Sequence, residues 1–234
     1  TKRGVRNQMY QFFVEPSQIQ GNRIVITGSD VNHIKNVLRM KPGEEIAVSN
    51  GTDGKEYRCG IEELLEEEII CTLRFIKEDG LELPARVTFF QGLPKADKME
   101  FIVQKAAELG VSRIVPYLSK NCVSRPDKTE KKVERWRKIA AEAAKQCGRG
   151  RLPEVAAVVP VAQAIAQAAE SETALFFYEN ERRTGLHDAL AGGVRDTVSL
   201  MVGPEGGFDP AEAKAAVDAG LQSVSLGTRI LRCA

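Results

Sequence analysis

Short runs of β-branched and aromatic residues recur along the first third of the chain. They read YQFFV, RIVIT, EIAVSN, EYRCGI and IICTLRFI, and polar or glycine-containing segments separate them. Such runs are typical of strands joined by turns, so we predict a small antiparallel β domain over residues 9–77. The acidic run EELLEEE inside it is expected to form a solvated edge.

One stretch of this first domain has helical periodicity instead. Residues 31–40 follow Ser29 and Asp30, either of which can cap a helix, and a Pro-Gly pair comes after them. The positions expected on the buried face are Val31, Ile34, Val37 and Leu38. We therefore predict a single helix packed against the strands.

The pattern changes after the linker-like segment KEDGLELPA. Buried-type strands such as VTFFQ, SRIVPY, EVAAVV, ALFFY, VSLMV and SVSL now alternate with helix-like stretches, the longest of which covers residues 129–147. Strands that alternate with helices predict a mostly parallel sheet covered on both faces. The fold class is therefore α/β, with a second domain over residues 84–234. Ligands bind such sheets beyond the carboxyl ends of the strands.

Composition and charge argue against several classes of protein, namely membrane, secreted, disulfide-stabilised and metal-binding proteins. The 33 basic and 32 acidic side chains give a net charge of +1, so any basic surface must be local. Apolar stretches are too short or too interrupted to span a bilayer, and the absence of a secretory signal favours a soluble, cytoplasmic protein. Five cysteines without a C-x-x-C pair, together with two histidines, suggest neither a disulfide framework nor a metal site.

Two glycine-bearing strand ends are the main candidates for a binding site. GPEGG, residues 203–207, follows VSLMV directly, and its glycines would let a ligand lie against backbone groups. Asp209 and Pro210 then predict the start of a helix. LGTRILRCA, residues 226–234, ends the last strand in the same way. Either stretch alone could be an ordinary turn or strand end, but two of them close together favour a shared pocket.

Basic residues near the ends of elements form a second group of candidates. Each one alone is more commonly a solvated surface charge, whereas together they could mark a track for RNA phosphates. His33 is more readily interpreted as a half-buried helix residue than as a catalyst, although it could also contact RNA. The candidate RNA contacts are His33, Arg39, Lys41, Lys95, Lys98, Arg125, Arg149 and Arg151.

Five strings in one order resemble the RsmE family of 16S ribosomal RNA uridine N3 methyltransferases. They are NHIKNVLRMKPGE, GLPK with KMEFIVQKAAELGV, AAEAAKQCGR, GPEGGF and LGTRILR. The resemblance implies a PUA-like β-barrel domain that binds RNA, followed by a SPOUT methyltransferase domain. In that domain a C-terminal trefoil knot would bind S-adenosylmethionine. It also implies a homodimer that acts on 16S rRNA or the assembled small ribosomal subunit.

The resemblance also assigns roles to the two loops. Arg229 and Arg232 adjoin the second loop and are expected to stabilise charge on the uracil during catalysis. The residues expected to bind the cofactor are Gly203, Pro204, Glu205, Gly206, Gly207, Leu226, Gly227, Ile230 and Leu231. The family pattern continues as R-I-L-R-x-E-T-A and a final helix, whereas this sequence stops at Ala234, so we expect an incomplete C-terminal end. Two alternatives stay open: a SPOUT enzyme with another target, such as a ribose 2′-hydroxyl, and a non-enzymatic rRNA-binding assembly protein.

Overall fold

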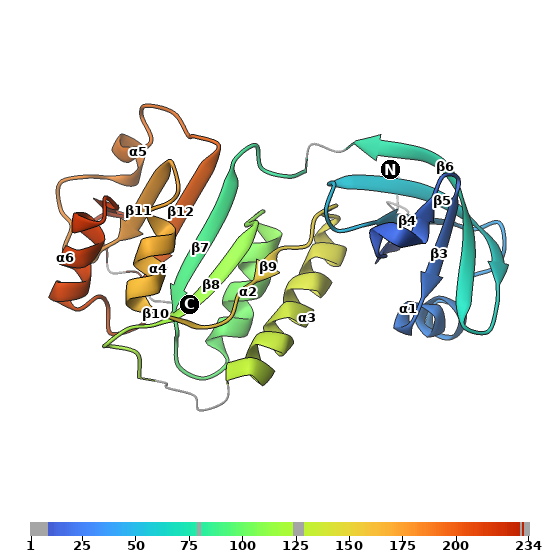
Figure 1. Ribbon diagram of the computed structural model, residues 1–234, viewed down its shortest axis with the longest axis horizontal. Helices are drawn as coiled ribbons and strands as arrows, with labels where there is room; N and C mark the ends of the chain where they lie inside the picture. The colour runs from blue at the N-terminus through green and yellow to red at the C-terminus, as the bar shows by residue number, and fades with distance from the viewer. Residues whose placement is uncertain (1–8, 79–80, 124–128, 230, 232–234) are drawn as a thin grey trace, which may run out of the picture. The chain divides into compact units, whose positions relative to one another are not determined.

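The computed structural model describes residues 9–78, 81–123, 129–229 and 231, and the chain divides into two compact units. The first unit comprises residues 1–82 and 144–152, and the second comprises residues 83–143 and 153–234. Figure 1 shows the elements of each unit along the colour gradient. The first unit therefore takes in a segment from much later in the chain, which includes the last turn of a long helix.

The first unit is built on a six-stranded sheet in the order β1-β4-β5-β6-β3-β2. Its strands are β1 (Gln11–Phe13), β2 (Ile19–Gln20), β3 (Arg23–Thr27), β4 (Glu45–Ser49), β5 (Lys55–Leu64) and β6 (Glu68–Glu78). Four of the five pairings are antiparallel, as the sequence predicts, but β1 and β4 pair in parallel. The fully antiparallel prediction is therefore wrong for this pair, because the long connection between β1 and β4 permits a crossover.

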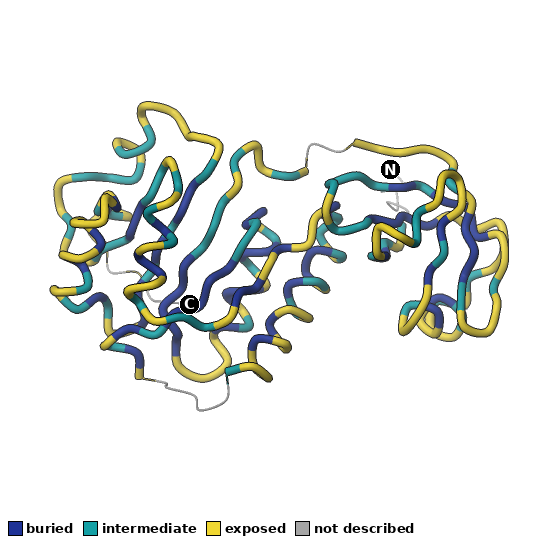
Figure 2. Tube along the Cα trace, viewed as in Figure 1, coloured by how far each residue is buried: buried dark blue, intermediate teal, exposed yellow. Residues whose placement is uncertain are grey.

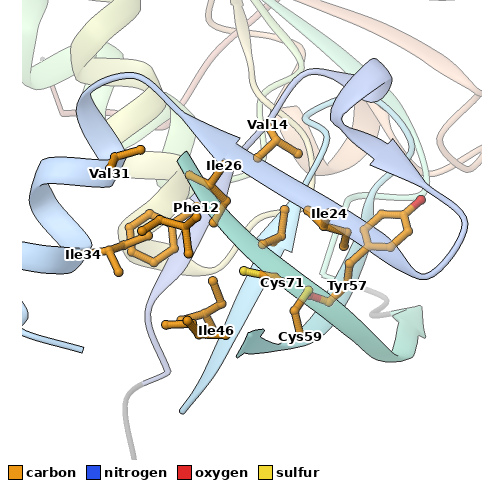
Figure 3. Packing of buried hydrophobic residues seen from close by; sticks show 13 residues of the cluster. Phe12, Val14, Ile24, Ile26, Val31, Ile34, Ile46, Tyr57, Cys59 and Cys71 are labelled. Atoms are coloured by element: carbon orange, nitrogen blue, oxygen red, sulfur yellow. The ribbon is translucent and has the colours of Figure 1, made fainter. Parts of the chain in front are cut away.

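Alternate side chains of these strands form the core of the first unit (Figure 3). In β3, Ile24 and Ile26 are buried while the residues around them reach the surface. Burial raises the pKa of the thiols of Cys59 and Cys71 to about 12, with Cys71 adding to the effect on Cys59. These two cysteines therefore behave as small hydrophobic side chains rather than as nucleophiles.

The helix predicted over residues 31–40 is shorter and wider than expected. An α-helical turn, α1 (Ser29–Asn32), continues into a π-helical turn over His33–Val37. The wider turn shifts the helical period, so Ile34 is buried but the side chain of Val37 is 64% exposed. The placement of Val37 on the buried face is therefore wrong. Gly28 precedes the helix, and neither Ser29 nor Asp30 occupies the capping position.

The second unit is a parallel sheet, which confirms the α/β prediction. Its order is β10-β8-β7-β12-β11-β13, with β9 paired to β8, and every pairing is parallel. The strands are β7 (Arg86–Gly92), β8 (Arg113–Leu118), β9 (Glu154–Val155), β10 (Val159–Pro160), β11 (Thr173–Phe177), β12 (Thr197–Val202) and β13 (Gln222–Val224). Each expected strand is present, although EVAAVV is divided between β9 and β10.

Four of the described helices bury apolar side chains against the two faces of this sheet. They are α2 (Lys98–Glu108), α3 (Thr129–Cys147), α4 (Val161–Ala168) and α6 (Pro210–Asp218). The short helix α5 (Leu186–Ala189) has no buried residue. One core cluster joins α2 and α3 to the sheet, and a separate cluster joins α4 and α6 to it. Figure 2 shows how buried and exposed positions alternate along α3. Within the described ranges, none of these helices is both long and apolar enough to cross a bilayer.

Candidate functional site

The carboxyl ends of five strands of the second unit lie level with one another. The register pairs residues at the ends of neighbouring strands, namely Gly92 with Tyr117, Gln91 with Val202, and Phe177 with both Val202 and Val224. From β7, the strands β8 and β10 are added on one side of the sheet, whereas β12, β11 and β13 lie on the other side of β7. The strand order therefore changes direction next to β7. Ligands usually bind such a sheet at this position, beyond the carboxyl ends of the strands, where the loops lie.

The loop after β12, residues 203–208, is here called the glycine loop. Its first residues lie against the end of β7, where a Cβ atom on Gly92 would be 2.6 Å from both N and Cδ of Pro204. The buried amide of Gln91 donates to the carbonyl oxygens of Gly92 at 2.8 Å and Gly203 at 3.3 Å. The Tyr117 hydroxyl donates to the Val202 carbonyl at 2.9 Å. These contacts fix the position from which the glycine loop departs.

Glu205 attaches the glycine loop to the segment after β7. Its carboxylate accepts the Lys95 backbone N–H at 3.1 Å and lies 3.1 Å from Nζ of Lys98. Burial raises the pKa of Glu205, but hydrogen bonds from its own backbone N–H, from Lys95 and from Lys98 outweigh this and hold the pKa below its usual value. Glu205 therefore stays ionised and braces the loop.

Two later glycines of the loop face protein atoms. Nδ2 of Asn121 donates to the carbonyl oxygens of Gly206 at 3.1 Å and Gly207 at 3.3 Å. A Cβ atom on Gly206 would lie 3.0 Å from Cβ of Asn121, and Gly207 has a φ of +69°. The sequence interpretation did not single out Asn121. The available signal was its place three residues after the end of SRIVPYL, a strand whose carboxyl end shares the edge with GPEGG.

The helix behind the glycine loop begins as predicted. Asp209 accepts the Ala211 backbone N–H at 3.0 Å and forms a capping box with Glu212, while Pro210 occupies the first helical position. Nζ of Lys120 lies 2.6 Å from the Asp209 carboxylate. The hydrogen bond from Lys120, followed by that from Ala211, lowers the pKa of Asp209. The start of α6 is thus held both by its own cap and by the turn after β8.

The second predicted loop follows β13. Gly227 has a φ of +112°, and a Cβ atom built on it would meet no heavy atom of the described residues within 4 Å. The side chains of Leu226 and Leu231 are 51% and 57% exposed, and Arg229 is also exposed. The N–H and the carbonyl of Gly227 are both hydrogen-bonded to the Ser225 hydroxyl, at 3.2 and 3.1 Å. The uncovered apolar side chains beside this turn suit the approach of a partly apolar ligand. Ile230 and Arg232 lie outside the described residues.

The predicted RNA contacts differ in accessibility. His33, Arg39, Lys41 and Arg151 are exposed in the first unit, and Lys95 and Lys98 are exposed in the second. The surface position of His33 differs from the half-buried position expected, and Arg125 lies outside the described residues.

Arg149 is 3% exposed, and its guanidinium bonds the Glu82 carboxylate at 2.6 and 3.2 Å. This geometry gives it a structural role inside the first unit. In the part of the chain that the structure describes, no group of three His, Cys, Asp or Glu residues is arranged to hold a metal.

Comparison with known proteins finds matches for both domains and for nearly the whole chain. Residues 81–234 match an RNA methyltransferase domain, and residues 26–74 match an RNA methyltransferase PUA domain. Ribosomal RNA small subunit methyltransferase E of Bacillus subtilis is 33% identical over 96% of this chain and 91% of its own length. The chain belongs to the ribosomal RNA small subunit methyltransferase E family. The Aquifex aeolicus member of the family is 31% identical, again over 96% of this chain.

Solved structures agree with this family assignment. A Neisseria gonorrhoeae ribosomal RNA small subunit methyltransferase E bound to S-adenosyl methionine is 31% identical and superposes with a TM-score of 0.84. The superposition covers 96% of this chain and 92% of the other. A Legionella pneumophila protein in complex with the bound cofactor SAM is 29% identical, with a TM-score of 0.81 over 97% of this chain and 92% of the other. The resemblance read from the five strings, including the PUA domain and the α/β methyltransferase domain, is confirmed.

Proposed function

We propose that this protein methylates N3 of a uridine in 16S ribosomal RNA and uses S-adenosylmethionine as methyl donor. The observation that carries the proposal is family membership along both domains, from residue 26 to residue 234. A relative of the same name holds S-adenosyl methionine in its crystal structure. The glycine loop and the loop after β13 supply backbone-lined walls of the kind that such a ligand requires.

The residues of the two loops fit this cofactor. Gly227 leaves space where a side chain would lie, and Leu226 and Leu231 offer exposed apolar surface for an adenine or a methylene chain. We assign cofactor binding to Gly203, Pro204, Glu205, Gly206, Gly207, Leu226, Gly227, Ile230 and Leu231. Within this set, Glu205 acts by bracing the loop, because its carboxylate is engaged by Lys95 and Lys98. When bound, S-adenosylmethionine supplies an electrophilic methyl group.

The chemistry of the uridine defines what the protein must provide. N3 is an imide nitrogen that becomes nucleophilic as it loses its proton, and negative charge then spreads to the two carbonyl oxygens of the uracil. Arg229 and Arg232 belong to the second loop, and we propose that their guanidinium groups stabilise this charge. Because N3 lies on the Watson–Crick edge, the target base must be unpaired or flipped out when it reacts.

The RNA is held, in this proposal, by basic residues of both units. His33, Arg39, Lys41 and Arg151 are exposed in the first unit, and Lys95 and Lys98 are exposed in the second. Arg125, which lies outside the described residues, completes the proposed set. Arg149 is left out because its charge is used by Glu82. We further propose that the protein is a cytoplasmic homodimer with a SPOUT-type trefoil knot, as the family resemblance implies. Analytical ultracentrifugation would test the dimer.

A labelling experiment tests the activity. The protein is incubated with small ribosomal subunits that lack the modification and with S-adenosylmethionine carrying a labelled methyl group, and the RNA is then digested to nucleosides. We expect the label in N3-methyluridine. Label on a ribose would instead identify a 2′-O-methyltransferase, and a protein that binds RNA but neither binds the cofactor nor transfers label would be a non-enzymatic assembly factor.

An arginine variant tests the proposed catalytic role. Arg229→Ala should lower kcat by about 10–1000-fold, because one charge-stabilising donor is lost, while the Kd for S-adenosylmethionine changes little. Arg195→Ala removes an exposed arginine of the same unit and serves as the matched control. If Arg229→Ala keeps the wild-type kcat, another group stabilises the uracil.

A further inference from the structure

The turn after β8 makes contacts that its sequence does not suggest. Nδ2 of Asn121 reaches the carbonyl oxygens of Gly206 and Gly207 at 3.1 and 3.3 Å. The preceding residue, Lys120, donates its backbone N–H to Glu212 at 2.8 Å and pairs through Nζ with Asp209. Two consecutive residues thus tie one turn to the glycine loop and to the helix behind it.

The glycine loop needs such external contacts. Glycine loses more backbone entropy on ordering than any other residue. A loop with three glycines therefore samples many conformations unless contacts with neighbouring residues hold it. A loop that becomes ordered only when its ligand binds weakens the affinity by that ordering cost. Inside the loop, one turn hydrogen bond joins the Gly207 N–H to the Pro204 carbonyl at 2.9 Å. Gln91 holds the start of the loop through the Gly203 carbonyl, and Phe208 is buried in the core at its end. Between these ends, the side-chain contacts described above come from Glu205 on one side and Asn121 on the other.

The fit between Asn121 and the loop is close. A Cβ atom on Gly206 would lie 3.0 Å from both Cβ and the carbonyl oxygen of Asn121, so a larger residue at position 206 would push Asn121 away by a few tenths of an ångström unless the loop shifts. A carboxamide is suited to this place because its NH₂ group donates without carrying charge. An aspartate at this position would instead place a carboxylate oxygen, which only accepts hydrogen bonds, next to the carbonyl oxygens of Gly206 and Gly207.

We propose that Asn121 is a positioning residue that orders the glycine loop for cofactor binding. The inference rests on the proposed function, since it takes the glycine loop to be a wall of the cofactor site. Asn121 acts through Gly206 and Gly207 rather than by touching cofactor or RNA. Because Asn121 orders the glycine loop before the cofactor binds, binding does not carry the cost of ordering the loop, and the affinity for S-adenosylmethionine is higher.

Calorimetry on the whole protein tests this role. Asn121→Asp should raise the Kd for S-adenosylmethionine about tenfold, because a donor to two carbonyls becomes an acceptor. Asn121→Ala, which removes the donor without adding charge, should raise it by about threefold. The KM for RNA should stay within about twofold in both variants. Asn22→Asp makes the same chemical change on an exposed turn of the first unit and serves as the matched control.

Amide hydrogen exchange in the glycine loop supplies a second, ligand-free measurement. Exchange should be faster in both Asn121 variants than in the wild type, while the strand amides of β7 and β12 keep their protection. A wild-type protein that binds no S-adenosylmethionine would refute the proposed function, and with it the cofactor role of Asn121. A wild-type protein that binds it, with Asn121→Asp equal to it in both Kd and loop exchange, would overturn the positioning role alone. Asn121→Ala covers the case in which the aspartate variant does not fold.

Discussion

Glycine serves a different physical purpose at each position of the candidate site. Gly92 allows two backbone segments to approach, Gly206 makes room for Asn121, and Gly227 adopts a backbone φ of +112° that side-chain-bearing residues rarely adopt. The sequence interpretation attributed all the glycines of GPEGG to a ligand lying against the main chain. The structure adds a second reason at residue 206, because a Cβ atom there would crowd Asn121 at 3.0 Å.

Gly92→Ala tests the close approach between β7 and the glycine loop. The new Cβ atom would meet Pro204 at 2.6 Å, so the loop or the strand has to move. We expect a loss of about 1–3 kcal/mol in the free energy of unfolding, measured by denaturant titration, and weaker binding of S-adenosylmethionine. Gly192→Ala is the control, because a Cβ atom there meets nothing within 4 Å. A Gly92→Ala protein as stable as the control would show that the glycine loop can move away from the new Cβ atom without loss of stability.

The Glu205 brace predicts a dependence on pH. The folded protein lowers the pKa of Glu205 below its usual 4.5, so the folded state binds fewer protons than the unfolded state as that range is crossed. The stabilisation is therefore complete above pH 4.5 and is lost as the pH falls through the lowered value. Glu205→Gln should cost about 1 kcal/mol of unfolding free energy at pH 7, and the difference from wild type should shrink below pH 4.5.

Glu170→Gln controls for the loss of one exposed carboxylate from the same unit. Urea titrations at a series of pH values measure both differences. A Glu205→Gln difference that is constant from pH 7 to pH 3 would show that the carboxylate charge contributes nothing to the brace.

Helices and strands with strong periodicity could be predicted closely from the chain. Residues 129–147 form α3 with the expected bounds, because Val133, Trp136 and Ala140 mark one face at helical spacing. The π-helical turn after α1 could not be predicted, since its hydrophobic spacing fits an α-helix equally well. Contacts such as Asn121 with Gly206 join segments 85 residues apart, and a local pattern carries no record of them.

Trp136→Ala tests how far α3 depends on its apolar face. Trp136 is 5% exposed and belongs to the cluster that joins α2 and α3 to the sheet. We expect a loss of about 3–5 kcal/mol in the free energy of unfolding, because a large cavity remains. The change is measured by far-ultraviolet circular dichroism, as the chain's single tryptophan is removed. Lys138→Ala, on the exposed face of α3, should change the free energy by less than about 0.5 kcal/mol.

Arg149 joins the two separate chain segments that make up the first unit. Its buried guanidinium bonds Glu82 with two hydrogen bonds, and its backbone carbonyl accepts the amide of Gln11 at 2.9 Å. Residues at the two ends of the first segment are thus tied to residues 144–152. The predicted RNA contact at this position is replaced by a bond internal to the fold.

Arg149→Met should destabilise the protein by about 3 kcal/mol, because it leaves the Glu82 carboxylate partly buried without its partner. The double variant with Glu82→Met should recover part of this loss. Arg39→Met, at an exposed arginine of the same unit, should leave stability unchanged and weaken RNA binding. Thermal denaturation and RNA filter binding separate the two effects. A stable Arg149→Met protein with weakened RNA binding would restore Arg149 to the RNA surface.

The insertion of residues 144–152 into the first unit also bears on how the chain is made. Domains commonly fold one after another as they leave the ribosome, beginning at the N-terminus. Here the first unit cannot be completed until residue 152 has emerged, by which time β7, α2, β8 and α3 of the second unit have been synthesised. A gene fragment that stops at Glu82 would encode a PUA domain without its closing segment. The first unit can therefore be completed only after part of the second has been synthesised.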